Sequence, residues 1–143
     1  MRARFAVAVV VTLPLVALQG CGGGGVPFAP VSGKVTMDGK PLAGVNVYFI
    51  PAAKPGSDIA GDTGGGVTDE NGQYVLKTST RDGLKDGTQV GKHKVIISLQ
   101  ETRGEGDRSV TREKLPKKYN AETELTAEVA PGNNQKDFDL KSR

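Results

Sequence analysis

The sequence has one cysteine, one histidine and no tryptophan among its 143 residues. A single cysteine excludes a disulfide within the chain, so side-chain packing and strand pairing must hold the fold together. A single histidine, His93, excludes a zinc site built from several histidines. Only three tyrosines and four phenylalanines are present, which is a poor supply for a platform that stacks nucleic-acid bases. We therefore expect no nucleic-acid partner.

The charge of the chain is close to balanced, and no block of five like charges occurs. The whole sequence has 19 basic and 16 acidic residues, for a net charge of +3. Its first twenty residues hold two of the basic residues, Arg2 and Arg4, and none of the acidic ones. Without them the sum is 17 minus 16, or +1. This balance does not indicate a nucleic-acid-binding protein.

The N-terminal segment has the organisation of a secretory signal. Arg2 and Arg4 precede an apolar stretch of about fourteen residues, 5–18, which is short for a membrane span. Leu18-Gln19-Gly20-Cys21 follows and resembles the lipobox of bacterial lipoproteins. The resemblance implies cleavage before Cys21, diacylglycerol on its thiol and acylation of the new amino terminus. Several acyl chains, at ~0.8 kcal/mol per buried CH₂, would hold the protein stably on a membrane.

Three regions are predicted along the chain. Residues 1–20 form the lipoprotein signal peptide, residues 21–30 contain the lipidated cysteine and a Gly/Pro tether, and residues 31–143 form one domain. The tether reads GGGGVPFAP after Cys21. In bacteria with two membranes, aspartate after the cysteine favours inner-membrane retention, so Gly22 favours the outer membrane, facing the periplasm or the cell surface.

Alternation of apolar and polar residues predicts about seven short strands and no helix. Strands are expected at 31–37, 45–50, 67–69, 73–77, 89–99, 125–129 and 138–140, with turn signals between them. Two long exposed loops are expected at 52–66 and 100–114. The fold class is all-β, a single antiparallel β-sandwich.

Two segments resemble the signatures of carboxypeptidase regulatory-like domains, which are transthyretin-like sandwiches. Residues 31–47, VSGKVTMDGKPLAGVNV, resemble the opening hairpin, and residues 68–74, TDENGQY, resemble the second signature hairpin. Further similarity lies at 90–95, 115–120 and 138–140. The resemblance implies a Greek-key topology and a tyrosine where His93 stands. It implies no catalytic residues and no cofactor, because the shared motifs are turn and core motifs.

Two groups of side chains could carry chemistry. Asp58, Asp62, Asp69 and Glu70 could supply oxygen ligands to Ca²⁺, but their spacing matches no known calcium loop, so turn formation is the favoured role. A basic set interleaved with acids could contact anionic glycans or lipid headgroups, although a solvated loop is favoured. Its members are Arg103, Arg108, Arg112, Lys114, Lys117 and Lys118.

The sequence therefore predicts a non-enzymatic lipoprotein of the cell envelope, anchored at Cys21 and serving as a structural or binding module. Its partner would be an envelope protein or a glycan, contacted through the loops 52–66 and 100–114 or through an exposed strand edge. His93 is expected to be a semi-buried core residue, and no catalytic, cofactor or metal site is expected. The alternative is a small envelope enzyme or a carbohydrate-processing or carbohydrate-binding accessory, which would need an acid–base pair in a pocket.

Overall fold

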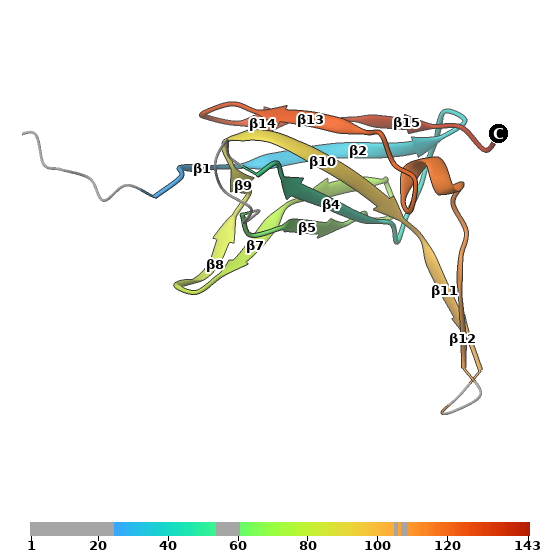
Figure 1. Cartoon of the computed structure of the whole chain (residues 1–143). Coiled ribbons are helices and arrows are strands. Elements are labelled where there is room, and N and C mark those ends of the chain that lie inside the picture. Colours follow the sequence, from blue (N-terminus) through green and yellow to red (C-terminus); the bar gives the residue numbers. More distant parts are fainter. Residues whose placement is uncertain (1–24, 54–60, 105, 107–108) are drawn as a thin grey trace, which may run out of the picture.

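The computed structural model describes residues 25–53, 61–104, 106 and 109–143, and these residues form an all-β structure (Figure 1). Cys21 and the whole signal segment lie outside the described residues, as does Asp58. A 3₁₀ helix, η2 at Lys117–Tyr119, interrupts the strands. Within the described ranges there is no helix long and apolar enough to cross a membrane.

The larger sheet has six antiparallel strands in the order β13-β10-β4-β5-β7-β8. In chain order they are β4 Asn46–Pro51, β5 Gly64–Val67, β7 Lys77–Thr80, β8 Gly83–Asp86, β10 Gly91–Ser98 and β13 Thr126–Val129. The pairing of β10 with β4 is the longest ladder and runs from His93 opposite Pro51 to Ser98 opposite Asn46. It joins the two strands that have the strongest apolar alternation in the sequence.

The second sheet is built around β2, Val31–Met37. One side of β2 pairs with β6, Gln73–Val75, and β3, Lys40–Pro41, both antiparallel. Its other side pairs with β14, Asn134–Gln135, and β15, Phe138–Leu140, and both of these run parallel to β2. The expected purely antiparallel pairing is thus wrong for this sheet, because alternation predicts a strand but not its direction.

The two sheets share one buried apolar core. Val47 and Phe49 on β4 and Val95 and Ile97 on β10 are fully buried, as is Val35 on β2. Phe49 also meets Phe138 of β15 edge-on, with ring centroids 6.2 Å apart. Burial of a large apolar side chain contributes roughly 1.5–3 kcal/mol, so these contacts are the main stabilising term of this disulfide-free domain.

Two further strand pairs lie outside these sheets. β1, Phe28–Ala29, pairs with β9, Thr88–Gln89, close to the start of the described chain. β11, Gln100–Arg103, pairs with β12, Val110–Glu113, in a two-stranded hairpin. The prediction of a loop over 100–114 is therefore wrong, although most of the segment is exposed as expected. The missed signal was alternation among polar rather than apolar residues.

Several strands are confirmed close to their predicted bounds, namely those at 31–37, 45–50, 89–99, 125–129 and 138–140. Of the predicted loop 52–66, residues 54–60 lie outside the described ranges, and Gly64–Val67 forms β5. The strands are shorter and more numerous than the seven expected, since β6 and β7 divide one predicted strand between the two sheets.

Gly33 on β2 lies where the backbone of the segment between β14 and β15 comes very close, which generates a stability prediction. A Cβ there would lie 1.8 Å from the carbonyl oxygen of Lys136, to which the Tyr74 hydroxyl donates a hydrogen bond of 2.6 Å. We expect Gly33→Ala to lower the free energy of unfolding by about 1–3 kcal/mol in urea denaturation. Gly65→Ala is the control, because its Cβ would be 3.4 Å from the Tyr48 ring and should be accommodated. Equal losses in both variants would contradict the steric argument.

Candidate functional site

The β11–β12 hairpin projects from the body of the domain, at the end opposite β1 (Figure 1). Its ladder pairs Glu101 with Arg112 and Arg103 with Val110. Alternate residues of a strand point to opposite faces, so these four side chains share one face. Lys114, two residues after Arg112, continues it. We call this set (Glu101, Arg103, Val110, Arg112 and Lys114) the cationic face.

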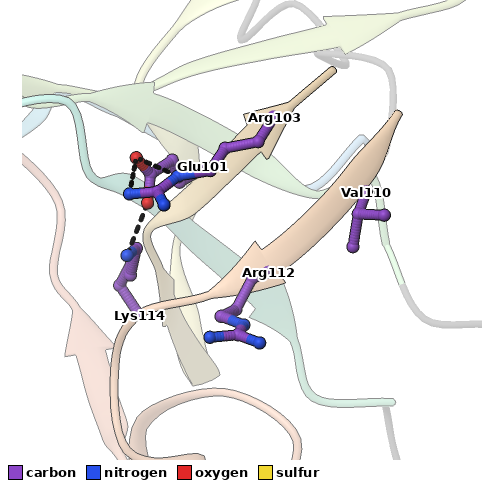
Figure 2. A pocket seen from close by; sticks show the side chains of 5 residues that line it. All are labelled: Glu101, Arg103, Val110, Arg112 and Lys114. Carbon is purple, nitrogen blue, oxygen red and sulfur yellow. Dashed lines mark hydrogen bonds and ion pairs between the residues drawn. The ribbon is translucent and has the colours of Figure 1, made fainter. Parts of the chain in front are cut away.

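The cationic face surrounds a shallow hollow of about 170 Å³, lined by its five residues (Figure 2). Glu101 lies on one side of it between two cations. One carboxylate oxygen, Oε1, is 3.0 Å from Arg103 Nη2, and the other, Oε2, is 2.5 Å from Lys114 Nζ. Hydrogen bonds from Lys114 and Arg103 lower the pKa of Glu101, so this carboxylate stays ionised and holds both cations in place.

On the opposite face of the hairpin the paired residues are uncharged except at the base. There the carboxylate of Glu113 binds the end of β10, and we call this set of hydrogen bonds the clamp. Thr102 and Thr111 lie across from each other with their hydroxyl oxygens 3.0 Å apart. At the base, Glu113 Oε2 accepts a hydrogen bond of 2.5 Å from the Ser98 hydroxyl. Its Oε1 accepts from the backbone N–H of Leu99 at 3.0 Å and of Leu115 at 2.9 Å. One carboxylate therefore ties the hairpin to the end of β10.

These hydrogen bonds decide the charge state of Glu113. Partial burial by itself raises the pKa of this carboxyl group. The hydrogen bonds from the Ser98 hydroxyl and from the backbone N–H groups of Leu115 and Leu99 outweigh burial, so the pKa lies below its ordinary value. The clamp is consequently anionic at neutral pH and is made of charge-assisted hydrogen bonds.

The structure brings together three of the six predicted basic residues, Arg103, Arg112 and Lys114. Arg108 lies outside the described residues. Lys118 belongs to η2, where its Nζ donates to the carbonyl oxygen of Arg143 at 2.9 Å and lies over the Tyr119 ring. The acids that interleave with the basic residues in sequence do not all share their face, since Glu113 points to the other side. This segregation was not predicted, although the two-residue spacing of 101 and 103 on one strand and of 110, 112 and 114 on the other is the signal that could have revealed it.

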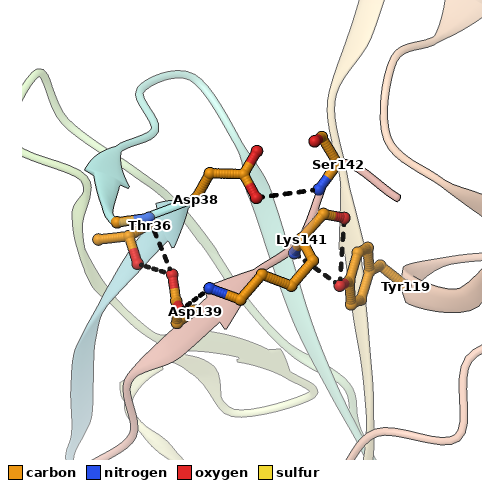
Figure 3. Close-up of polar contacts among 7 residues, drawn as sticks. Thr36, Asp38, Tyr119, Asp139, Lys141 and Ser142 are labelled. Carbon is orange, nitrogen blue, oxygen red and sulfur yellow. Dashed lines mark hydrogen bonds and ion pairs between the residues drawn. The ribbon is translucent and has the colours of Figure 1, made fainter.

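A second polar cluster lies where the chain ends, and it is structural (Figure 3). Asp139 Oδ1 accepts from the Thr36 hydroxyl at 2.8 Å, and its Oδ2 is 2.5 Å from Lys141 Nζ. Asp38 accepts from the backbone N–H of Ser142 at 3.3 Å. The Tyr119 hydroxyl accepts from the Lys141 N–H at 2.8 Å. These contacts fasten the segment after β15 to the β2–β3 turn and to η2.

His93 is fully buried rather than semi-buried as the sequence analysis expected. Its side chain is 2% exposed and lies beside Phe49, with ring centroids 5.7 Å apart. Nδ1 is 3.0 Å from the carbonyl oxygen of Gly91, which can only accept, so Nδ1 carries the proton. Nε2 then accepts from the Thr88 hydroxyl at 3.3 Å. Burial lowers the pKa of His93, against the opposing hydrogen bond to Gly91, and favours this neutral form.

A depression of about 490 Å³ over β10 and β13 involves both His93 and Glu128, the combination that an acid–base site would need. The strand register separates the two side chains. Glu128 lies opposite Lys92, whereas His93 lies opposite Ala127. Adjacent residues of a strand point to opposite faces, so Glu128 is on the solvent side and His93 is in the core. They cannot act as a pair on one substrate.

Of the carboxylates considered for calcium, Asp69 has a local structural role. Asp69 Oδ1 accepts hydrogen bonds from the backbone N–H groups of Asn71 at 2.8 Å and of Gln73 at 2.9 Å. This is the turn-forming role that the sequence analysis favoured. Within the described ranges, no group of three or more His, Cys, Asp or Glu side chains is arranged to hold a metal ion.

No family model matches the chain, and no curated protein matches it. Two solved structures are similar. One is a Pseudomonas aeruginosa protein, provisionally described as a carbohydrate-binding protein, with 13% identity over 81% of this chain and 89% of that one and a TM-score of 0.40. The other is a 9R-lipoxygenase from Cyanothece, with 17% identity over 80% of this chain and 16% of that one and a TM-score of 0.39. Similarity at this level carries no argument about function.

The Glu113 clamp predicts that this carboxylate contributes more to stability than the exposed one in the same hairpin. We expect Glu113→Gln to lower the free energy of unfolding by about 1–3 kcal/mol, because three hydrogen bonds to a charged group are weakened. Amide exchange at Leu99 and Leu115 should also accelerate. Glu101→Gln is the matched control and should change stability little, since its ion pairs are on the surface. Identical behaviour of the two variants would rule out the clamp.

The burial of His93 predicts a pH dependence of stability. Its pKa in the folded protein lies below the ordinary value of 6.5, so the unfolded chain binds the proton more readily. The contribution of neutral His93 to the free energy of unfolding is therefore fully present above pH 6.5, and it is lost as the pH falls from 6.5 towards the lowered pKa. Urea denaturation from about pH 8 to about pH 5 should show this slope, and His93→Gln should reduce it. An unchanged slope in the variant would assign the effect to other groups.

Proposed function

We propose that this chain is a lipid-anchored, extracytoplasmic and non-enzymatic binding module of the cell envelope. One observation carries the proposal: the β11–β12 hairpin extends from the end of the domain opposite β1, the first strand after Cys21 (Figure 1). A lipid at Cys21 would place the β1 end towards the membrane. The hairpin would then be held away from that membrane, where an envelope protein or glycan could reach it.

The length of chain between the anchor and the domain supports this orientation. Six residues, 22–27, separate Cys21 from Phe28, and even a fully extended chain spans at most about 3.6 Å per residue. The tether is therefore limited to about 25 Å from Cys21 to Phe28. A tether of this reach keeps Phe28, at the β1 end, within about 25 Å of Cys21. Glycine rather than aspartate at position 22 supports the outer membrane as the location.

Two features support the absence of enzymatic activity. The only histidine lies in the core with both ring nitrogens hydrogen-bonded, on the other side of the sheet from Glu128. Asp38 and Asp139 are engaged in holding the C-terminal segment (Figure 3). A general acid or base needs a side chain that reaches a substrate, and these groups do not offer one.

We further propose that the two sheets form a Greek-key sandwich of the carboxypeptidase regulatory-like type. The residues that carry the resemblance have the roles expected of turn and core motifs. Asp38 and Gly39, with φ of 49° and 81°, form the turn between β2 and β3. In the second motif, Asp69 supports the turn and Tyr74 is buried between the sheets. Burial raises the pKa of Tyr74, so its hydroxyl remains a donor to Lys136.

The anchor is tested by replacing Cys21. We expect the native protein to begin at Cys21 with acyl chains attached and to partition into the detergent phase, and Cys21→Ser to lack the acyl adduct and leave the membrane fraction. Gln19→Ala is the control, because alanine is common at this lipobox position and should preserve anchoring. Intact-mass spectrometry of the product from envelopes measures both. A native protein that retains Met1 or has no acyl adduct would contradict the proposal.

A further inference from the structure

We infer that the cationic face binds a glycan that carries carboxylate or phosphate groups, an inference that rests on the proposed function and specifies its ligand. Arg103, Arg112 and Lys114 against Glu101 give this face a net charge of 3 minus 1, or +2. The chain without its first twenty residues has a net charge of only +1. The rest of that chain therefore sums to −1.

One of the three cations is available to pair with a ligand, and the other two are held in position by Glu101. Arg112 is exposed, and among the described residues it has no carboxylate at ion-pair distance. Glu101 holds Arg103 and Lys114 beside the hollow. The planar guanidinium of arginine donates two parallel hydrogen bonds to a carboxylate or phosphate. An anionic group in the hollow would therefore meet arginines from both strands of the hairpin.

The size of the hollow determines what it can recognise. At about 30 Å³ per water molecule, its 170 Å³ accommodates a carboxylate or a phosphate with a few waters, but not a chain of sugar rings. The charged substituent of the polymer would be the recognised part, and the sugar backbone would lie across the hairpin. Binding at one such site is weak, but many anchored copies on one polymer give avidity.

Two other occupants fit the observations less well. Stable binding to a membrane surface combines charge with an apolar face that inserts, and Val110 is the one apolar side chain of the cationic face. The hairpin also extends away from the β1 end (Figure 1). A stable protein partner typically covers about 800 Å² and 20–30 residues on each side, far more than five side chains. A polymer with repeated anionic groups needs neither an apolar face that inserts nor a large contact area.

The test uses the complete lipidated protein, inserted through its own anchor into neutral phosphatidylcholine vesicles. Fluorescent polygalacturonate and poly(glycerol phosphate) are the anionic probes, and dextran is the neutral one. We expect both anionic probes, but not dextran, to co-sediment with the vesicles, more strongly at about 20 mM than at about 200 mM salt. The double variant Arg103→Gln/Arg112→Gln should bind about fivefold to thirtyfold more weakly. Lys40→Gln/Lys92→Gln removes the same charge from other exposed positions and should bind like wild type.

Several results would overturn the inference. These are equal binding of dextran, an equal loss in the control variant, or no binding of either anionic polymer at low salt. In a parallel assay protein-free vesicles that contain phosphatidylglycerol are added, and clustering of the protein-bearing vesicles with them in place of polymer binding would also overturn the inference. Thermal unfolding of both double variants should match wild type, so that a loss reports on charge and not on folding. Failure of the protein to enter vesicles would instead contradict the proposed function, and glycan binding would then be measured on the chain in detergent-free solution.

Discussion

The structure depends on one constraint, the alternation of side chains between the two faces of a strand. On β4 and β10 alternation directs Val47, Phe49, Val95 and Ile97 into the core, and their burial is the main stabilising term of a domain without a disulfide. The same constraint acts where no core is present. On the β11–β12 hairpin it separates the cations from the threonines, and the hairpin gains a charged face without any apolar packing.

The sequence predicted those elements whose alternation involves apolar residues. The strands at 31–37 and 45–50 were recoverable because apolar residues recur at every second position, and the turn at Asp38-Gly39 separates the first strand from its partner. The hairpin at 100–113 was not recoverable in the same way, because nearly all its residues are polar and neither face is buried. The parallel pairing of β14 and β15 with β2 was also inaccessible, since it depends on how the chain returns after β13.

For the candidate site, composition identified the basic residues but could not position them. Acidic and basic residues alternate closely along the hairpin, which suggested a solvated loop with little net field. In the structure Glu113 lies on the face opposite the cationic face and forms the clamp, whereas Glu101 lies on the cationic face and orients two cations. A single step in register would have exchanged the faces, so the charge pattern depends on the pairing of Glu101 with Arg112.

The attachment of the hairpin determines its direction. Its base is fixed by a carboxylate and by the hydrogen bond from the Lys114 N–H to the carbonyl oxygen of Leu99, 2.8 Å, whereas the core packs below it at Leu115. These hydrogen bonds fix the direction of the hairpin at its base, and the strand residues beyond the base are mostly exposed. The clamp thus sets where the cationic face is presented.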